Sequence, residues 1–368
     1  MIGRGTGRFV CHLCHVAAHS RPDGVLLVNL GSPASPRPAD VRRYLKEFLS
    51  DPRVLDMPTP LRWLLLRAVI LPFRPRRSAP MYASIWTPEG SPLLVHGRAL
   101  AEALSKRLGD GHRVVLAMRY GEPSIADGLE ALLAEDVGRI RVVPLFPHSA
   151  SSSSGSAVAR VYALAGRRWN VPDLDVLGPF YDDPGFIGAA AAVARPVLEE
   201  ARSDFVLFSY HGLPESHIRR SDSVGACRLD DACCSAVGTA NRFCYRAQCF
   251  ATTRALATEL GLASDAHTSA FQSRLGPTAW IAPQTDKLLP ELRARGVSKL
   301  AVVCPSFVAD CLETLEEIGI RAKEQWTELG GEDLRLIPCV NGHPAWVDTL
   351  AGWLTAPSTT PAQRDVPA

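Results

Sequence analysis

One histidine follows an apolar run and comes directly before a tight turn. The run covers residues 205–210, and His211 is followed by Gly212 and Pro214. An apolar run of this length, ended by a Gly/Pro turn, predicts a buried strand of a parallel sheet. His211 then lies at the carboxyl edge, where open α/β sheets bind ligands and an imidazole can exchange protons or bind a metal. A histidine that only caps the strand is the alternative.

A group of acids follows another apolar strand. Asp310, Glu313 and Glu317 lie where a helix is predicted to begin, just after the strand that ends near Cys304. Glu313 and Glu317 are four residues apart and so share a helix face, at the edge where His211 also lies. Histidine with carboxylates can form a metal site or a proton-transfer pair. The alternative is a helix cap with solvated acids.

A serine-rich loop at residues 146–156 also follows a strand and precedes a predicted helix at 157–165. Hydroxyls and backbone N–H groups at a helix amino terminus suit an anion such as phosphate or carboxylate, although a simple helix cap explains them equally well. No lysine-terminated phosphate loop is present, and the turn at Gly31 lacks the dinucleotide spacing. No nucleotide cofactor is therefore predicted.

Five cysteines gather in one polar stretch. They are Cys227, Cys233, Cys234, Cys244 and Cys249. Four thiolates can hold zinc or a [2Fe–2S] cluster, although the spacing matches neither a zinc finger nor a plant-type ferredoxin. Reduced surface thiols are the alternative, but so many would be an oxidation liability. Of the adjacent Cys233 and Cys234, one is expected to bind and the other to be spare.

The composition limits the class of protein. With 368 residues, 46% of them hydrophobic and 21% charged, the chain is long enough for two globular domains and is not of a disordered type. Its net charge of +2 gives no reason to expect nucleic acid as a partner. No apolar run of about 18 residues could span a bilayer, and residues 1–20 lack a secretory apolar region. We expect a cytoplasmic protein whose 10 cysteines are thiols or metal ligands.

Strands alternate with helices around these groups. Strands are predicted near residues 25–30, 112–120, 140–147, 174–180, 205–211, 279–283, 300–304 and 334–340. Helices are predicted at 97–108, 124–133, 157–165, 187–201, 251–260, 287–295 and 312–326, with a further one capped by Asp40. This succession predicts an α/β fold of two similar halves, each with about four parallel strands flanked by helices.

One apolar segment carries arginines at both ends. It runs from Leu61 to Phe73, contains Trp63, and is too short to span a bilayer. Apolar bulk with tryptophan and flanking arginines is typical of an interfacial segment. The alternative is a helix buried in the core with a basic exit loop.

Five separated motifs together resemble the ferrochelatase family over about residues 24–353. They lie at residues 27–33, 85–93, 209–214, 276–286 and 310–317. The resemblance implies two Rossmann-like halves, at 21–182 and 183–353, with a porphyrin cleft between them. It places an apolar lip near 60–73, a cysteine-rich insert at 223–249, a ragged tail at 1–20 and a disordered tail at 354–368.

The resemblance also implies an activity, the insertion of Fe²⁺ into protoporphyrin IX with release of two protons, the last step of haem synthesis. His211 matches the family's active-site histidine and Glu313 the carboxylate opposite it, as metal or proton handlers. Asp310 and Glu317 match the acidic line that leads there. The groups expected to bind porphyrin are Arg119, Tyr120, Ser149, Ser151 and Ser153. The lip implies peripheral association with the inner membrane, and a homodimer is compatible with the resemblance.

At two positions that concern metal binding, the sequence differs from animal-type members of the family. Cys311 stands where those members carry a histidine. Ser151 stands at the position of their internal cluster cysteine, and no cysteine follows Cys339. The clustered cysteines resemble the all-internal arrangement of some bacterial members, which implies a [2Fe–2S] cluster. Its expected ligands are Cys227, Cys234, Cys244 and Cys249, with Cys233 as the alternate.

The chemistry agrees with this reading. A planar macrocycle loses two protons as a divalent ion enters, so a neutral imidazole base and carboxylates are the groups required. Three alternatives remain at this point: a chelatase for coproporphyrin, one that inserts cobalt, and a non-catalytic carrier of tetrapyrrole or metal.

Overall fold

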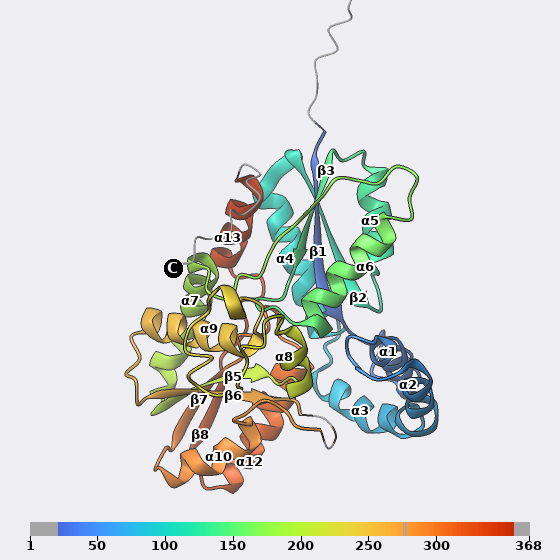
Figure 1. The fold of residues 1–368 in the computed structure, drawn as a ribbon. Helices are drawn as coiled ribbons and strands as arrows, with labels where there is room; N and C mark the ends of the chain where they lie inside the picture. The colour runs from blue at the N-terminus through green and yellow to red at the C-terminus, as the bar shows by residue number, and fades with distance from the viewer. Residues whose placement is uncertain (1–20, 275, 277, 357–368) are drawn as a thin grey trace, which may run out of the picture.

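Two four-stranded parallel sheets form the framework of the protein (Figure 1). The computed structural model describes residues 21–274, 276 and 278–356, so the tail predicted at 1–20 and most of that predicted at 354–368 lie outside the described residues. The first sheet contains β1 (Asp23–Gly31), β2 (His112–Tyr120), β3 (Arg139–Pro144) and β4 (Leu174–Val176). The second contains β5 (Phe205–His211), β6 (His267–Gln272), β7 (Lys299–Val303) and β8 (Asp333–Leu336).

Helices cover both faces of each sheet, so the strand interiors are mostly apolar, with buried polar residues such as Asn29, Ser209 and Gln272 as exceptions. In the first half they are α1 (Pro38–Ser50), α2 (Thr59–Leu65), α3 (Leu71–Ile85), α4 (Pro92–Leu108), α5 (Ile125–Ala134) and α6 (Ser156–Ala165). In the second they are α7 (Pro184–Ala201), α8 (Glu215–Ser221), α9 (Tyr245–Leu260), α10 (Thr285–Ala294), α11 (Leu312–Leu315), α12 (Lys323–Glu328) and α13 (Pro344–Thr355). The described part of the chain has three π-helical turns, at Leu66–Ile70, Ser151–Gly155 and Glu317–Ala322.

The two sheets have the same strand order, β2-β1-β3-β4 and β6-β5-β7-β8. In each, the first strand of the half lies between the next two strands of the chain, so the connections depart in opposite directions there. Ligands bind outside the carboxyl ends of parallel strands at such a switch point. The switch points fall at β1 and β3 in the first sheet and at β5 and β7 in the second. The serines after β3, His211 at the end of β5 and the acids after β7 therefore lie at these switch points.

The two halves share one apolar core. Val25 and Leu27 of β1 belong to the same buried cluster as Phe208 of β5 and Trp346 of α13. Helix α13 packs against both α4 and α7, and Figure 1 shows it beside α4. Buried Arg141 of β3 donates to the carbonyl oxygens of Trp353 (3.0 Å) and Leu354 (2.6 Å), which caps the carboxyl end of α13. The last helix of the chain therefore completes the first half.

The structure confirms the predicted fold class and corrects two local predictions. No strand forms at 279–283, and β6 lies at His267–Gln272 instead. The sequence pattern did not predict β6, because several of its side chains are polar. Ser269 and Gln272 are nevertheless buried, and both are hydrogen-bonded to other side chains. Helix α1 begins at Pro38 with Arg37 as its cap residue, so Asp40 lies in the first turn and is not the cap.

Candidate active site

His211 ends β5, and its imidazole is held in one orientation. Its Nδ1 lies 2.7 Å from the carbonyl oxygen of Gly212, and its ring lies edge-on to Phe307 at 6.2 Å. Because a carbonyl oxygen only accepts hydrogen bonds, Nδ1 of the neutral ring carries the proton. Nε2 then has a free lone pair. His211 is half-buried, and Nε2 is the ring nitrogen that could accept a proton.

Gln272 links the strand beside His211 to the acidic helix. It stands opposite His211 in the β5–β6 register. Its amide nitrogen donates to the backbone oxygen of Glu313 (2.6 Å), while its amide oxygen accepts from Ser209 (2.6 Å). Glu317 accepts from the Ser273 N–H at 2.7 Å. These bonds fix α11 and the π-helical turn that follows it against the carboxyl end of β6.

Glu313 lies where the two halves meet. Burial is the main reason that the pKa of Tyr44 on α1 and that of Tyr82 on α3 lie well above their usual values, and the negative charge of Glu313 adds to both shifts. Burial likewise raises the pKa of Cys311, whose thiol is hydrogen-bonded to Glu313. Glu313 is half-buried and is fixed at its backbone.

Asp310 is buried, and its carboxylate is occupied by the protein itself. Its Oδ1 accepts from the Cys339 N–H and from Thr314, both at 3.2 Å, and its Oδ2 accepts from the Asn341 amide at 2.7 Å. These bonds anchor the start of α11, which carries Glu313. The structure thus surrounds Asp310 with donors, whereas it leaves Glu313 and Glu317 only half-buried.

Arg119 and Tyr120 form a network with Asp51, which the sequence did not single out, and with Ser156 at the end of the serine-rich loop. Arg119 donates to Asp51 and to Ser156, both at 2.7 Å, and the fully buried Tyr120 donates to Asp51 at 2.9 Å. Burial by itself raises the pKa of Asp51. The hydrogen bonds that Asp51 accepts, first of all from Ser156, outweigh burial and hold its pKa below the usual value. Tyr120 therefore holds the network together from inside, while Arg119 remains partly exposed.

The serine loop after β3 is tied down from two sides. The N–H of Ser149 donates to the side-chain oxygen of Gln248 at 2.6 Å. The hydroxyl of Ser151 accepts from Arg53 at 3.1 Å. Ser153 lies in the π-helical turn with its N–H on the Ala150 carbonyl at 3.2 Å. The loop thus presents hydroxyls beside two arginines, Arg53 and the Arg119 of the neighbouring network.

A family model for ferrochelatase matches residues 22–356. The chain belongs to the ferrochelatase family. It is 48% identical over 329 residues to a ferrochelatase of Coxiella burnetii (strain Dugway 5J108-111), with 89% of this chain and 92% of that protein covered. It is 46% identical over 327 residues to a ferrochelatase of Legionella pneumophila (strain Corby), with 89% and 97% covered.

Solved structures show the same fold at low identity. SirB from Bacillus subtilis with Fe³⁺ is 13% identical, has a TM-score of 0.50, and matches over 90% of this chain and 94% of its own. The sirohydrochlorin chelatase SirB from Bacillus subtilis subspecies spizizenii, in complex with cobalt, is 12% identical with a TM-score of 0.50, over 90% and 93%. At these identities the likeness concerns the fold alone.

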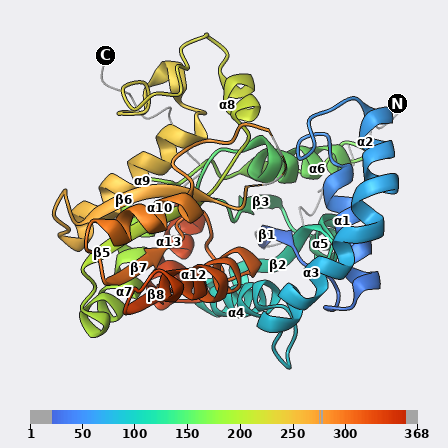
Figure 2. The same ribbon diagram turned by 90° about the horizontal axis from the view of Figure 1, so that it is seen from below.

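The apolar lip of this ferrochelatase-family chain is exposed. Helix α2, the π-helical turn and the start of α3 form it, and Figure 2 shows these helices to one side of the sheets. Its exposed large side chains are Leu61 (54%), Trp63 (56%), Leu64 (54%), Val69 (54%) and Phe73 (63%). A helix buried in the core, the alternative left open by the sequence, does not describe this segment. No helix among the described residues has both the length and the apolar character needed to cross a bilayer.

Four of the five clustered thiols are neighbours. The sulfurs of Cys233 and Cys234 lie 3.7 Å apart, and that of Cys234 is hydrogen-bonded to Cys244. Cys227 lies close enough for the charges of Cys233 and Cys234 to add to burial in raising its pKa. Cys249 differs, because it is 0% exposed on α9 within the shared core and hydrogen-bonded to Tyr245.

The donors in this segment are of the right chemical type for a cluster, but they do not yet converge. In the described part of the chain, no three His, Cys, Asp or Glu side chains form a ready metal site. Thiols are the ligands that [2Fe–2S] clusters take, and Arg246 lies within hydrogen-bond reach of Cys234. The residues present therefore fit the chemistry of a cluster.

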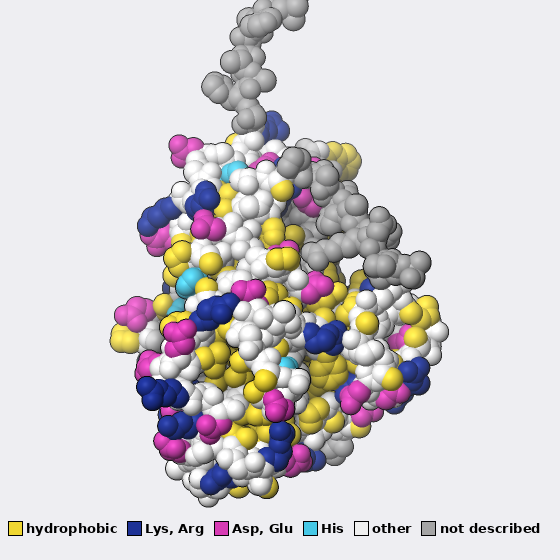
Figure 3. All heavy atoms as spheres, turned by 90° about the vertical axis from the view of Figure 1, so that its left-hand side faces the viewer, with side chains coloured by type: hydrophobic (Ala, Val, Ile, Leu, Met, Phe, Trp, Pro, Cys, Tyr) yellow, Lys and Arg dark blue, Asp and Glu magenta, His cyan; other side chains and the backbone are white. Residues whose placement is uncertain are grey.

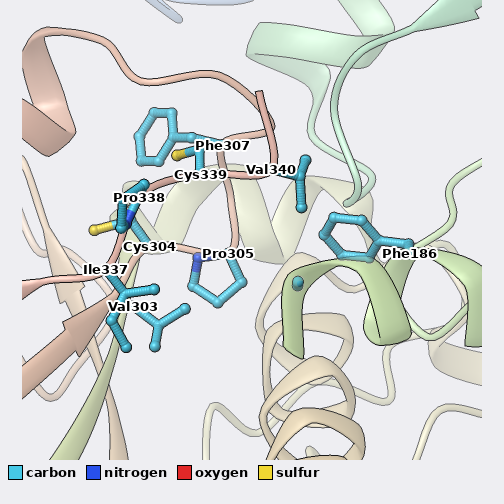
Figure 4. Close-up of a pocket in the computed structure, with 10 residues that line it drawn as sticks. Phe186, Val303, Cys304, Pro305, Phe307, Ile337, Pro338, Cys339 and Val340 are labelled. Carbon is cyan, nitrogen blue, oxygen red and sulfur yellow. The ribbon is translucent and has the colours of Figure 1, made fainter. Parts of the chain in front are cut away.

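A small apolar pocket lies outside this set of residues (Figure 4). Val303, Pro305 and Phe307 line it from the end of β7, and Phe186 lines it from α7. Neither His211 nor Glu313 contributes to its wall. We therefore assign it no part in the candidate site.

Proposed function

We propose that this protein inserts Fe²⁺ into protoporphyrin IX, with His211 as the base that accepts pyrrole protons. The observation that carries the proposal is the fixed ring of His211, whose Nδ1 bonds to Gly212 and whose Nε2 is free. Membership of the ferrochelatase family supports the substrate class. A neutral imidazole that carries its proton on one nitrogen keeps a lone pair on the other, and that lone pair can accept a proton from the substrate.

The acids on the other side of the site complete the chemistry. Glu313 is fixed through Gln272 and is only half-buried, so its carboxylate can attract the incoming dication or receive protons. Glu317 extends the acidic face next to Glu313, and Asp310 anchors the start of α11. Arg119 and the serines at 149, 151 and 153 are proposed to hold the porphyrin, whose propionates suit a guanidinium and hydroxyls.

Assays of purified protein with Fe²⁺ and protoporphyrin IX test the proposal. His211→Ala should lower kcat about 100-fold or more, the usual size of a general-base contribution, while porphyrin fluorescence quenching still reports binding. Glu313→Gln should lower kcat about tenfold or more. Glu324→Gln, which changes an exposed acid on α12, is the control and should leave kcat unchanged.

Three outcomes would point elsewhere. Full activity in both variants would remove His211 and Glu313 from the mechanism. Porphyrin binding with no turnover by any divalent metal would indicate a carrier. Faster turnover with coproporphyrin or with Co²⁺ would change the substrate and keep the mechanism.

We also propose a [2Fe–2S] cluster in the cysteine-rich segment. The sequence favours Cys227, Cys234, Cys244 and Cys249 as ligands. The 3.7 Å between the sulfurs of Cys233 and Cys234 favours Cys233 in place of Cys249, which lies on α9 and bonds to Tyr245. Bound there, the cluster would join loop residues between α8 and the start of α9.

Iron and acid-labile sulfide, measured with visible circular dichroism on protein prepared without oxygen, test this assignment. Cys233→Ser should lose both iron and sulfide, whereas Cys249→Ser should keep both. The reverse pattern would restore the ligand set favoured by the sequence. Colourless wild-type protein that contains zinc would contradict the cluster itself.

Finally, we propose that the lip attaches the protein to the cytoplasmic face of the inner membrane. Five exposed large apolar side chains on one short helical segment support it, together with Arg67, which lies over the Trp63 ring at 4.9 Å. Protoporphyrin IX is itself poorly soluble in water, so a lip in the membrane would meet its substrate there.

A further inference from the structure

A closed ring of hydrogen bonds holds the backbone of His211. The hydroxyl of Tyr245 donates to the His211 carbonyl oxygen at 2.8 Å. Ser306 accepts from the His211 N–H at 3.3 Å and lies 2.8 Å from the Tyr245 hydroxyl. Because the Tyr245 proton is used on the carbonyl, Ser306 donates to Tyr245. Both backbone groups of His211 thus depend on one tyrosine hydroxyl and one serine.

The topology shows why side chains are needed here. Strand β5 pairs with β7 only as far as Phe208 and Val303. Beyond that point β7 has ended, and Pro305 has no N–H to continue the ladder. On this side, His211 has lost its strand neighbour. Tyr245 and Ser306 supply the hydrogen bonds that a strand would otherwise make.

Tyr245 is the first residue of α9, directly after Cys244. One helical turn later, Gln248 bonds to the other side of the site. Its amide accepts from the Ser149 N–H at 2.6 Å and donates to the Ser149 hydroxyl at 3.1 Å and the Arg242 carbonyl at 2.6 Å. The first turn of α9 therefore contacts the end of β5, the serine loop after β3 and the cysteine-rich segment (Figure 1).

We propose that Tyr245 and Gln248 are positioning residues, through which the cysteine-rich segment sets the placement of His211 and of the Ser149 loop. This rests on the proposed function, because it assigns roles to His211 and Ser149. Neither residue touches the reacting atoms. Tyr245 acts on the base, and Gln248 acts on the loop proposed to hold the porphyrin.

Tyr245→Phe tests the first contact by removing one oxygen. The expected result is a fall in kcat of about tenfold or more with the KM for porphyrin unchanged, because small displacements of a catalytic group are costly. Tyr210→Phe is the matched control. Tyr210 is also a buried tyrosine, it precedes His211 in β5, and its hydroxyl bonds instead to Thr253 at 2.8 Å. It should lose stability without loss of kcat.

The ¹⁵N chemical shifts of the His211 imidazole give a readout that does not depend on turnover. The wild-type ring should show the proton on Nδ1. Tyr245→Phe should mix the two tautomers, whereas Tyr210→Phe should not. If wild-type protein fails to insert iron but these shifts behave as described, the proposed function fails and the positioning role stands. Identical shifts and kcat in the two tyrosine variants would overturn the positioning role.

The link to the cysteines is tested by non-additivity. Cys244→Ser should lower kcat in the wild-type background and change it little further in the Tyr245→Phe background, because both act through the same contact. Gln248→Met should instead raise the KM for porphyrin with kcat unchanged. Fully additive losses in kcat would overturn the link between Cys244 and His211.

Discussion

The tautomer of His211 is fixed by a main-chain oxygen. The sequence shows the types of the side chains but not the positions of main-chain atoms, so it could not predict this tautomer. The Gly212 carbonyl accepts from Nδ1, while the fold closes Tyr245 and Ser306 around the backbone of His211. A histidine at a strand end could be recognised as a candidate from the sequence. Its state could not, because that state is set by atoms that the tertiary fold brings together.

His148 offers a prediction about pH. It is 2% exposed, its Nε2 lies 2.9 Å from the Thr252 hydroxyl, and burial lowers its pKa to about 3. The unfolded chain has an ordinary histidine pKa of about 6.5, so between these two values the unfolded state binds more protons. Stability from a neutral His148 is therefore complete at neutral pH and is lost as the pH falls below about 6.5.

Denaturant unfolding at pH 7 and at pH 5.5 measures this effect. The free energy of unfolding of the wild type should fall by about 1 kcal/mol more than that of His148→Gln over this interval. Comparing this pH-dependent change between the two proteins cancels the contributions of other titrating groups and the pH-independent effect of the substitution. Equal slopes in the two proteins would show that His148 is already accessible to protons in the folded state.

The residues that the sequence did not single out share one property. Asp51, Tyr245 and Gln248 form hydrogen bonds to groups far away along the chain. His211 and Glu313 could be proposed from the sequence because their side-chain types could carry the chemistry themselves. Tyr245 directly follows a cysteine that was singled out, and that adjacency was the only signal in the sequence for it.

At the scale of elements, the helix predicted at 312–326 is one continuous segment in three pieces. Helix α11 ends at Leu315, a π-helical turn covers Glu317–Ala322, and α12 follows. A π-helical turn shifts the residues after it around the axis and is common at functional sites. It changes which side chains beyond the turn share a face with Glu313. Glu317 is the first residue of the turn, and its bond to Ser273 could not be predicted from the spacing of the acids.

The lip gives a prediction at the same scale. Trp63→Glu combined with Phe73→Glu should lower binding to phosphatidylethanolamine and phosphatidylglycerol vesicles about tenfold or more, because each aromatic ring that leaves the interface forfeits about 1.5–3 kcal/mol. Co-sedimentation with the vesicles measures it. Trp169→Glu is the control, since Trp169 is 99% exposed but lies outside the lip.

Trp169→Glu should bind vesicles as the wild type does. Undiminished binding by the lip variant would remove the lip from the membrane interface. On the face drawn in Figure 3, which is the left-hand side of Figure 1, basic and acidic side chains are interspersed.

At the scale of the molecule, the repetition of one strand order in both halves places the site. Each half could be predicted as a succession of strands and helices, because apolar runs and helical periodicity are local signals. The order of strands within each sheet could not, since it depends on the direction of each crossover. The polar strand β6 could not be predicted either. Its buried polar side chains are hydrogen-bonded to partners such as Thr253, which only the tertiary fold brings close.

Arg141 supplies a prediction for the whole fold. Arg141→Met removes the donors to the last carbonyls of α13 and should lower the free energy of unfolding by about 2 kcal/mol, since buried acceptors lose a charged donor. Arg107→Met is the matched control. It breaks the ion pair between α4 and Asp348 of α13, in which both side chains are more than half exposed, and it should cost at most about 1 kcal/mol.

Chemical denaturation of both variants measures these costs. If the two substitutions cost the same, the buried cap on α13 has no special weight. If Arg141→Met costs more, the attachment of the chain's last helix to its first sheet is a principal source of stability.

That attachment also bears on how the chain is made. The apolar cluster around Val25 and Leu27 includes Trp346 and Leu350, which a ribosome adds only after the strands of the second sheet. During translation, the first sheet emerges with this part of its core uncovered and must wait for α13 before Arg141 finds its acceptors. The nascent first half therefore exposes apolar surface until α13 has been synthesised.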